Sequence, residues 1–278
     1  MDHAAAPVIS TPFTDLDRMP APMLAMVIEA LAEMSRHPEI IRVREAGYAA
    51  LRAGAGTRLL DAGCGGGEVA RRLAAMAGPD GGVTAVDYSA ATIEAARSRH
   101  DGSNVQYVQG DVSRLDLGPD SVDGVWCERV LQHVAEPGRV IDEFIRVTGP
   151  GGRICLIDTD WRSLAFDGMP HGLTDSVRTH WLDQFTAGQL DMGRTLRGRL
   201  VRAGLGEVEA QPVTLFFDTP ASAGVVLPVV NPTVPAEIGM WPTGEARDAW
   251  LAEVARAGDR GDFLAVLTIW VVAGTVGS

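Results

Sequence analysis

The chain has 278 residues, of which 46% are hydrophobic and 22% charged, and a formal net charge of −12. This length suits one large α/β domain or two small ones, and the composition is typical of a globular protein rather than a disordered one. An acidic chain lacks the basic surface that neutralises phosphates, so we expect no nucleic-acid partner. The longest apolar stretch, 263–275, is too short to cross a bilayer, and no basic leader precedes an apolar segment. We therefore expect a cytoplasmic protein with no membrane partner.

Two compositional details remove further classes of chemistry. All 24 basic residues are arginine, which excludes a P-loop lysine and Schiff-base chemistry. The three cysteines are far apart, and no cluster of His, Asp or Glu has the spacing of metal ligands. The sequence therefore predicts no metal site.

The first part of the chain predicts a helical cap. Residues 1–20 carry proline and scattered acids without periodicity and are expected to form an extended or partly disordered lead. Apolar residues at helical spacing then predict one helix from near Pro22 and another over 38–51. Glycines 54 and 56 end this region.

From residue 58 the pattern alternates between short apolar strands and helices. We expect strands over 58–61, 82–87, 105–109, 122–127 and 153–158, and helices over 68–76, 90–100 and 137–147. Strands that are apolar throughout are typical of a parallel sheet with helices on both faces. Because βαβ crossovers are right-handed, the pattern predicts a doubly wound α/β sheet.

The last third is less regular. Residues 171–203 read as mainly helical, with a helix over 193–203, and 208–217 and 263–273 read as a final strand pair. Between these strands, 219–258 contains five prolines and is expected to be a long lid or binding loop.

A glycine-rich segment carries the strongest functional signal. Asp61 ends the first buried strand, and Gly63, Gly65 and Gly67 follow at alternate positions before a helix. Glycines let a ligand approach the backbone at the carboxyl ends of the strands. A dinucleotide fingerprint would need Gly or Ala where Glu68 stands, and a P-loop would need lysine, so both alternatives fail.

Five ordered segments over about residues 58–160 resemble the class I (Rossmann-like) S-adenosylmethionine-dependent methyltransferases, in particular the small-molecule subgroup similar to ubiquinone/menaquinone and natural-product methyltransferases. The segments are Asp61 to Gly67, Val86-Asp87, Gly110-Asp111-Val112, Asp123 to His133, and Gly149-Pro150-Gly151-Gly152. The resemblance implies a mostly parallel seven-stranded sheet whose last strand is antiparallel.

The resemblance also implies roles for the cofactor residues. Asp61, Gly63, Gly65 and Gly67 would wrap the methionine part of the cofactor. Asp87, with Tyr88 beside it, would bind the ribose hydroxyls, since a carboxylate accepts two hydrogen bonds from a cis-diol. Further cofactor contacts are expected from the residues after the third and fourth strands, namely Gly110, Asp111, Val112, Glu128 and Arg129. Arg44 on the second helix is placed near the cofactor carboxylate by family geometry.

The sequence indicates the residues that bind the methyl acceptor less clearly than those that bind the cofactor. Four large side chains fall in segments that cover the active site in the family and are expected to bind the substrate: Trp161, Trp181, Met240 and Trp241. Each could instead pack the cap onto the sheet. His133 and His171 are the candidate bases, although an apolar setting favours a structural role for His133.

These observations predict methyl transfer to a small, apolar or aromatic metabolite at an O, N or C acceptor, with S-adenosylmethionine as cofactor and S-adenosylhomocysteine as product. A role in secondary metabolism and a homodimer are further expectations. We expect a single domain over 1–278, with a cap over 1–56, a cofactor-binding core over 57–160, and a substrate cap with the final strands over 161–278. A cyclase with bound cofactor and a non-catalytic partner protein remain as alternatives.

Overall fold

The computed structural model describes residues 16–184, 189–236 and 240–277. Its centre is one seven-stranded sheet in the order β3-β2-β1-β4-β5-β7-β6. β7 is antiparallel to both of its neighbours, and the other pairings are parallel. The strands are β1 (Arg58–Ala62), β2 (Gly82–Asp87), β3 (Val105–Gln109), β4 (Val122–Glu128), β5 (Thr148–Asp167), β6 (Gly206–Phe217) and β7 (Leu264–Thr275). The predicted doubly wound sheet with an antiparallel last strand is confirmed.

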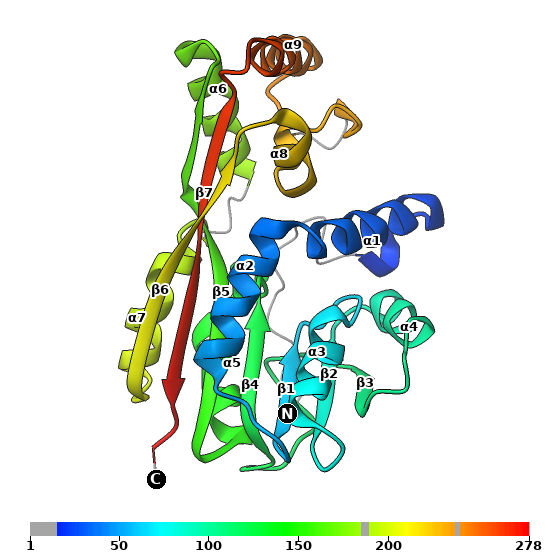
Figure 1. The fold of residues 1–278 in the computed structure, drawn as a ribbon, viewed down its shortest axis with the longest axis vertical. Coiled ribbons are helices and arrows are strands. Elements are labelled where there is room, and N and C mark those ends of the chain that lie inside the picture. Colours follow the sequence, from blue (N-terminus) through cyan, green and yellow to red (C-terminus); the bar gives the residue numbers. More distant parts are fainter. Residues whose placement is uncertain (1–15, 185–188, 237–239, 278) are drawn as a thin grey trace, which may run out of the picture.

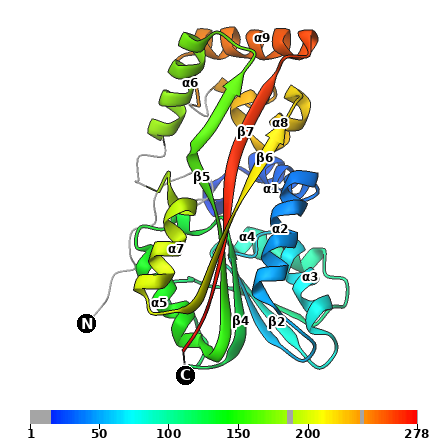
Figure 2. The same ribbon diagram turned by 60° about the vertical axis from the view of Figure 1, so that its left-hand side comes forward.

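Helices cover both faces of the sheet (Figures 1 and 2). The α-helices are α1 (Ala21–Ser35), α2 (Pro38–Leu51), α3 (Glu68–Ala77), α4 (Ala90–Ser98), α5 (Pro137–Val147), α6 (His171–Gln184), α7 (Met192–Arg202), α8 (Pro220–Val226) and α9 (Gly244–Arg260). The 3-10 helices are η1 (Leu16–Arg18), η2 (Leu131–His133) and η3 (Pro228–Val230). Buried side chains of α2, α3 and α4 share one core cluster, and those of α5 and α7 share the other. None of the helices in the described ranges is long and apolar enough to span a membrane.

The last three strands extend beyond the rest of the sheet and form an arm with α6, α8, α9 and η3 (Figures 1 and 2). The cluster on the α2 face continues into this arm through Trp181, Phe217 and Trp250. Because one apolar cluster joins the two parts, the arm is packed onto the core.

α1 lies between the arm and the core. It contacts α8 on one side, and its Ile28 and Leu31 lie beside Gly66, Thr92 and the start of α3 on the other. η1 and α1 therefore form a strap over the carboxyl ends of β1 and β2.

Two predicted elements are wrong in extent or kind. The strand predicted over 153–158 is the central part of β5, which bends at a register shift between Asp160 and Ala165 and continues to Asp167. The loop expected over 219–258 is largely helical: Thr219 caps α8 and Thr243 caps α9. Most of the lead expected over residues 1–20 lies outside the described residues.

Candidate cofactor and acceptor site

The glycine-rich segment forms the turn between β1 and α3. Gly63, Gly65 and Gly67 have φ angles of 80°, 50° and 77°, which glycine adopts without strain. A Cβ atom at Gly63 would lie 2.1 Å from a Val130 methyl group, and one at Gly67 would lie 2.7 Å from the Tyr107 hydroxyl. The turn therefore requires glycine at these two positions for both conformation and space.

Asp87, at the end of β2, is tied to this turn. Its Oδ2 accepts a hydrogen bond from the Gly65 N–H at 2.9 Å, and its Oδ1 accepts from the Ser89 N–H at 3.0 Å and the Thr92 hydroxyl at 2.9 Å. A carboxylate offers about four acceptor positions, so it can also receive a ligand hydroxyl. The neighbouring Tyr88 is 59% exposed.

Asp17, in η1, holds the strap against the same corner. Its carboxylate accepts hydrogen bonds from the Ser89 hydroxyl at 2.6 Å and from the Ala90 and Ala91 N–H groups at 3.0 and 3.1 Å. The two N–H groups are orphan donors of the first turn of α4, where negative charge is stabilising. Asp17 could not be predicted from the sequence, because its partners are about seventy residues away in the chain.

Asp61, in β1, is the most isolated acid of the site. It is 2% exposed, and its Oδ2 has no hydrogen-bond partner among the described residues. Burial, and then the negative charge of Glu128, raise the pKa of Asp61 to about 8. A buried carboxyl group in this position is stabilised by a cationic partner such as a ligand ammonium group.

The predicted residues after β3 lie on the neighbouring strand. The Gly110 N–H donates to the Asp87 carbonyl at 2.9 Å, and Asp111 Oδ1 accepts from the Ser113 N–H at 2.8 Å. Val112 packs against the α5 side of the core. Asp111 therefore stabilises the turn in which it lies. It follows the end of β3, as Asp87 stands at the end of the neighbouring β2.

Glu128, at the end of β4, lies between two arginines. Arg44 of α2 donates from Nε and Nη2 to the two Glu128 oxygens at 2.8 and 3.1 Å, and Arg129 Nη2 lies 3.2 Å from Oε1. Burial opposes the ionisation of Glu128, but the charges of Arg44 and Arg129 outweigh it and lower its pKa. Glu128 is therefore an anion that fixes both guanidinium groups.

η2 is joined to β5 by buried hydrogen bonds that the sequence analysis missed. Asp158 is 1% exposed and accepts from the Gln132 N–H at 3.0 Å and the Thr159 N–H at 2.9 Å, while Gln132 Oε1 accepts from the Trp161 indole at 2.7 Å. Burial raises the pKa of Asp158 to about 7. Ile157-Asp158 repeats the arrangement of Val86-Asp87, an acid at the end of an apolar run, and this signal was available in the sequence.

The two candidate bases are not brought together. His133 ends η2, where burial and then the charge of Arg129 lower its pKa to about 4, so its imidazole is neutral at pH 7. His171 is exposed and begins α6 in the arm, beyond the end of β5. From Asp158, beside η2, to the strand end at Asp167 the chain covers roughly 20–30 Å.

The four predicted substrate residues differ in setting. Trp161 is half-buried beside η2, and its ring meets that of Trp181 edge to face at 4.9 Å. Trp181 and Trp241 are 3% and 4% exposed and belong to the core cluster, against which Met240 packs. Trp161 is therefore the member of this set that adjoins the carboxyl edge directly.

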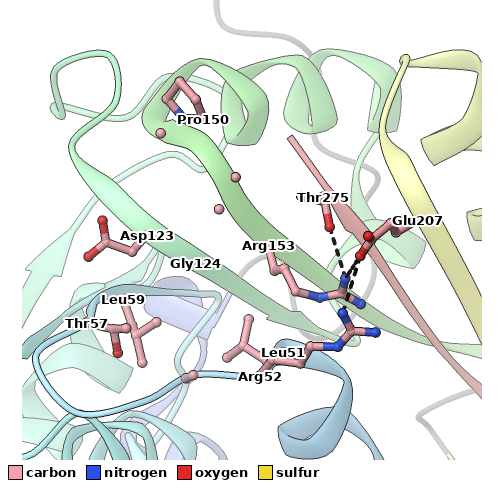
Figure 3. Close-up of a pocket in the computed structure, with 14 residues that line it drawn as sticks. Leu51, Arg52, Thr57, Leu59, Asp123, Gly124, Pro150, Arg153, Glu207 and Thr275 are labelled. Atoms are coloured by element: carbon pink, nitrogen blue, oxygen red, sulfur yellow. Dashed lines mark hydrogen bonds and ion pairs between the residues drawn. The ribbon is translucent and has the colours of Figure 1, made fainter. Parts of the chain in front are cut away.

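The described residues include no group of three His, Cys, Asp or Glu side chains that could hold a metal ion. A cavity of about 460 Å³ lies at the opposite, amino edge of the sheet (Figure 3), between Leu59, the Gly149–Gly152 turn and Glu207. Arg52 and Arg153 share Glu207 there. This cavity is separate from the acids at the carboxyl edge.

Comparison with known proteins agrees with this geometry. Residues 60–156 match a family model described as a methyltransferase domain. The chain is 33% identical to an uncharacterized 37.1 kDa protein in transposon TN4556 of Streptomyces fradiae, over 80% of this chain and 64% of that protein. It is also 33% identical to demethylmenaquinone methyltransferase of Clavibacter sepedonicus, over 52% of this chain and 60% of that protein. The matches thus span about three fifths of the length of these relatives.

Two solved structures share the fold. Phosphoethanolamine N-methyltransferase 2 of Haemonchus contortus, in complex with phosphomonomethylethanolamine and S-adenosylhomocysteine, has a TM-score of 0.63 at 18% identity, covering 97% of this chain and 61% of that chain. The [4+2]-cyclase SpnF has a TM-score of 0.61 at 19% identity, covering 98% and 99%. At such identities the likeness concerns the fold alone.

A glycine turn followed by acids on successive strand ends, on a doubly wound sheet with an antiparallel last strand, defines a Rossmann-like cofactor-binding protein. Together with the family match, it identifies residues 60–156 as a methyltransferase domain of the class I, S-adenosylmethionine-dependent kind.

Proposed function

We propose that the protein transfers a methyl group from S-adenosylmethionine to a small apolar or aromatic metabolite of secondary metabolism. The observation that carries this proposal is the combination of the glycine turn with two acids, Asp61 and Asp87, at one edge of the sheet. S-adenosylmethionine has an ammonium group, a ribose diol and no phosphate. Carboxylates that would repel a pyrophosphate therefore suit it.

The residues present fit this cofactor. The unpartnered Oδ2 of Asp61 would face its ammonium group, and Asp87 would accept hydrogen bonds from the ribose hydroxyls. Gly63 and Gly67 leave the backbone open where any side chain would collide with Val130 or Tyr107. The adenine would then lie by Gly110, Asp111 and Val112, on the next strand.

The bound cofactor would supply an electrophilic methyl group on a sulfonium. The contribution of the chain is to align the acceptor with that group and to exclude water from it. The strap formed by η1 and α1 lies over this edge, and Trp161 offers an aromatic surface beside it. For a hydroxyl acceptor His133 is the predicted base, but its pKa of about 4 makes it a weak one, whereas an ionised oxygen or an electron-rich carbon needs no base.

The acceptor class is supported by Trp161 and by one relative. The name of the Clavibacter relative gives demethylmenaquinone, an apolar aromatic molecule, as its substrate. We also propose that cap, core and arm act as one domain in the cytoplasm, without nucleic-acid or membrane partners.

The test is incubation of the protein with methyl-labelled S-adenosylmethionine and a panel of quinone-like, indole and phenolic metabolites. We expect label in at least one acceptor and an equal amount of S-adenosylhomocysteine. Conversion of a panel compound without label would instead indicate a cyclase. Tight cofactor binding without any conversion would indicate a non-catalytic partner protein. Either outcome overturns the proposed methyl transfer.

A further inference from the structure

Arg129 is held in an unusual conformation directly after β4. Its φ angle is 56°, in the left-handed region that non-glycine residues rarely adopt. Its N–H donates to the Ile157 carbonyl at 2.7 Å, which fixes the backbone at this point. Strained positions of this kind are concentrated at functional sites.

The guanidinium group of Arg129 has poor partners. Nη2 shares Glu128 with Arg44, and Nη1 lies 2.9 Å from the Met34 sulfur, a weak acceptor. Nε is buried and has no hydrogen-bond partner in the described structure. Both Asp158 oxygens accept backbone N–H groups, and neither makes a hydrogen bond or ion pair with Arg129 in the described structure. Two half-buried arginines thus share Glu128 as their one hydrogen-bonded carboxylate in the described structure, and a second anion beside Arg129 would add to this pairing.

The two arginines of this cluster have different surroundings. Arg44 lies within electrostatic range of Asp61 and Glu68, on the side of the glycine turn. Arg129 lies within range of Asp158 and His133, and its carbonyl accepts from the Gln132 side chain at 3.3 Å. Arg129 therefore lies next to the side of the site that carries Trp161, while its guanidinium group also contacts Met34 of α1.

We infer that Arg129 binds an anionic oxygen of the methyl acceptor, so that the acceptor carries an ionised acid group, either a carboxylate or an ionised phenol or enol. This inference rests on the proposed function, because it assumes that the cofactor occupies the glycine-turn side. Bound to Arg129, the anion pairs with one of the two arginines that share Glu128. The planar guanidinium group of Arg129 fixes its orientation.

The experiment uses the protein saturated with S-adenosylhomocysteine and two matched pairs of probes in calorimetry: 1-naphthoate with 1-naphthamide, and 4-nitrophenolate with 4-nitroanisole. We expect at least one anion to bind roughly ten- to a hundred-fold more tightly than its neutral partner. The pair that shows the preference distinguishes a carboxylate from a phenolate. Equal affinities within both pairs, or no measurable binding of either anion, overturn the inference.

Two variants locate the effect. Arg129→Gly suits the left-handed conformation and should fold, and it should lose the anion preference while its affinity for S-adenosylhomocysteine stays within about three-fold of wild type. Arg129→Lys should retain part of the preference. Arg52→Gly is the matched control, since Arg52 is also left-handed, with φ 55°, and pairs with glutamates at the opposite edge. It should leave the preference unchanged.

A loss of S-adenosylhomocysteine binding in Arg129→Gly would assign Arg129 to the cofactor. It would overturn this inference but not the proposed function. A failure of wild-type protein to bind S-adenosylhomocysteine would instead contradict the proposed function. The two failures are therefore distinguishable.

Discussion

At the scale of single residues, acids rather than bases define the carboxyl edge of the sheet. Asp61, Asp87 and Glu128 end or nearly end their strands, and Asp158 lies in β5 one residue beyond the partner of Glu128. The neighbours of these four acids differ. Glu128 is ionised between arginines, whereas Asp61 is buried without a partner for Oδ2. The edge is therefore prepared for a ligand that carries positive charge and hydroxyl groups.

The first prediction concerns Asp61 and pH. Its pKa rises from 3.8 in the unfolded chain to about 8 in the folded protein, so folding favours the protonated form. The contribution of Asp61 to stability is then fully present below pH 4 and is lost as the pH rises through 8. Urea unfolding of wild type and Asp61→Asn should show the wild type losing stability relative to the variant between pH 5 and pH 9. A difference that does not change with pH would contradict this account of Asp61.

The second prediction concerns the glycine turn. Gly63→Ala should lower the free energy of unfolding by about 2–4 kcal/mol, because it adds strain at φ 80° and a collision with Val130. Gly65→Ala is the matched control: its φ is 50°, but its Cβ atom would meet nothing within 4 Å, so we expect a loss of about 1 kcal/mol. Chemical denaturation measures both. Equal losses would show that the close packing of Val130 does not restrict this turn.

At the scale of elements, the strap is the feature that only the structure reveals. Asp17 attaches the strap to the core, because its carboxylate caps α4. Asp17→Ala should lower stability by about 1 kcal/mol and should speed the dissociation of S-adenosylhomocysteine in stopped-flow measurements. Glu94→Ala, an exposed change in the middle of α4, is the control and should alter neither. Unchanged dissociation in Asp17→Ala would mean that the strap does not gate the cofactor.

The core elements could be predicted because local patterns determine them. The predicted strands over 82–87 and 105–109 and the helix over 137–147 coincide with β2, β3 and α5, whose apolar runs and periodicity are unambiguous. The strand predicted over 153–158 was too short, because Asp160 and Arg162 interrupt the apolar run. Those residues lie at the bend of β5, where the strand leaves the core for the arm.

The prolines of 219–258 led to the wrong prediction of a long loop there. Pro220 stands at the first turn of α8, a position where proline favours a helix, and Trp250, Val254 and Ala257 follow a helical spacing in α9. The site residues that were missed have a different cause. Asp17 and Gln132 act through partners distant in sequence, Ser89 and Trp161, and no local pattern reports such contacts.

At the scale of the whole molecule, the sheet separates two ends with different chemistry. The carboxyl edge carries the glycine turn, the buried acids and the strap, while the amino edge carries the exposed pair of Arg58 and Asp123. The arm extends the last three strands beyond the core (Figure 2). One apolar cluster runs through both. The position of the site thus follows from strand order. Its preference for an acceptor depends on the side chains that the strap and the arm place beside it.

The most direct test of the central claim is calorimetric titration of the protein with S-adenosylmethionine and with NAD. We predict that S-adenosylmethionine binds and NAD does not, and that Asp87→Ala weakens this binding by about 1.5–3 kcal/mol because charge-assisted hydrogen bonds are lost. Asp123→Ala, at the amino edge, should bind as wild type does. Tighter binding of NAD, or an affinity for S-adenosylmethionine that Asp87→Ala leaves unchanged, would contradict the account.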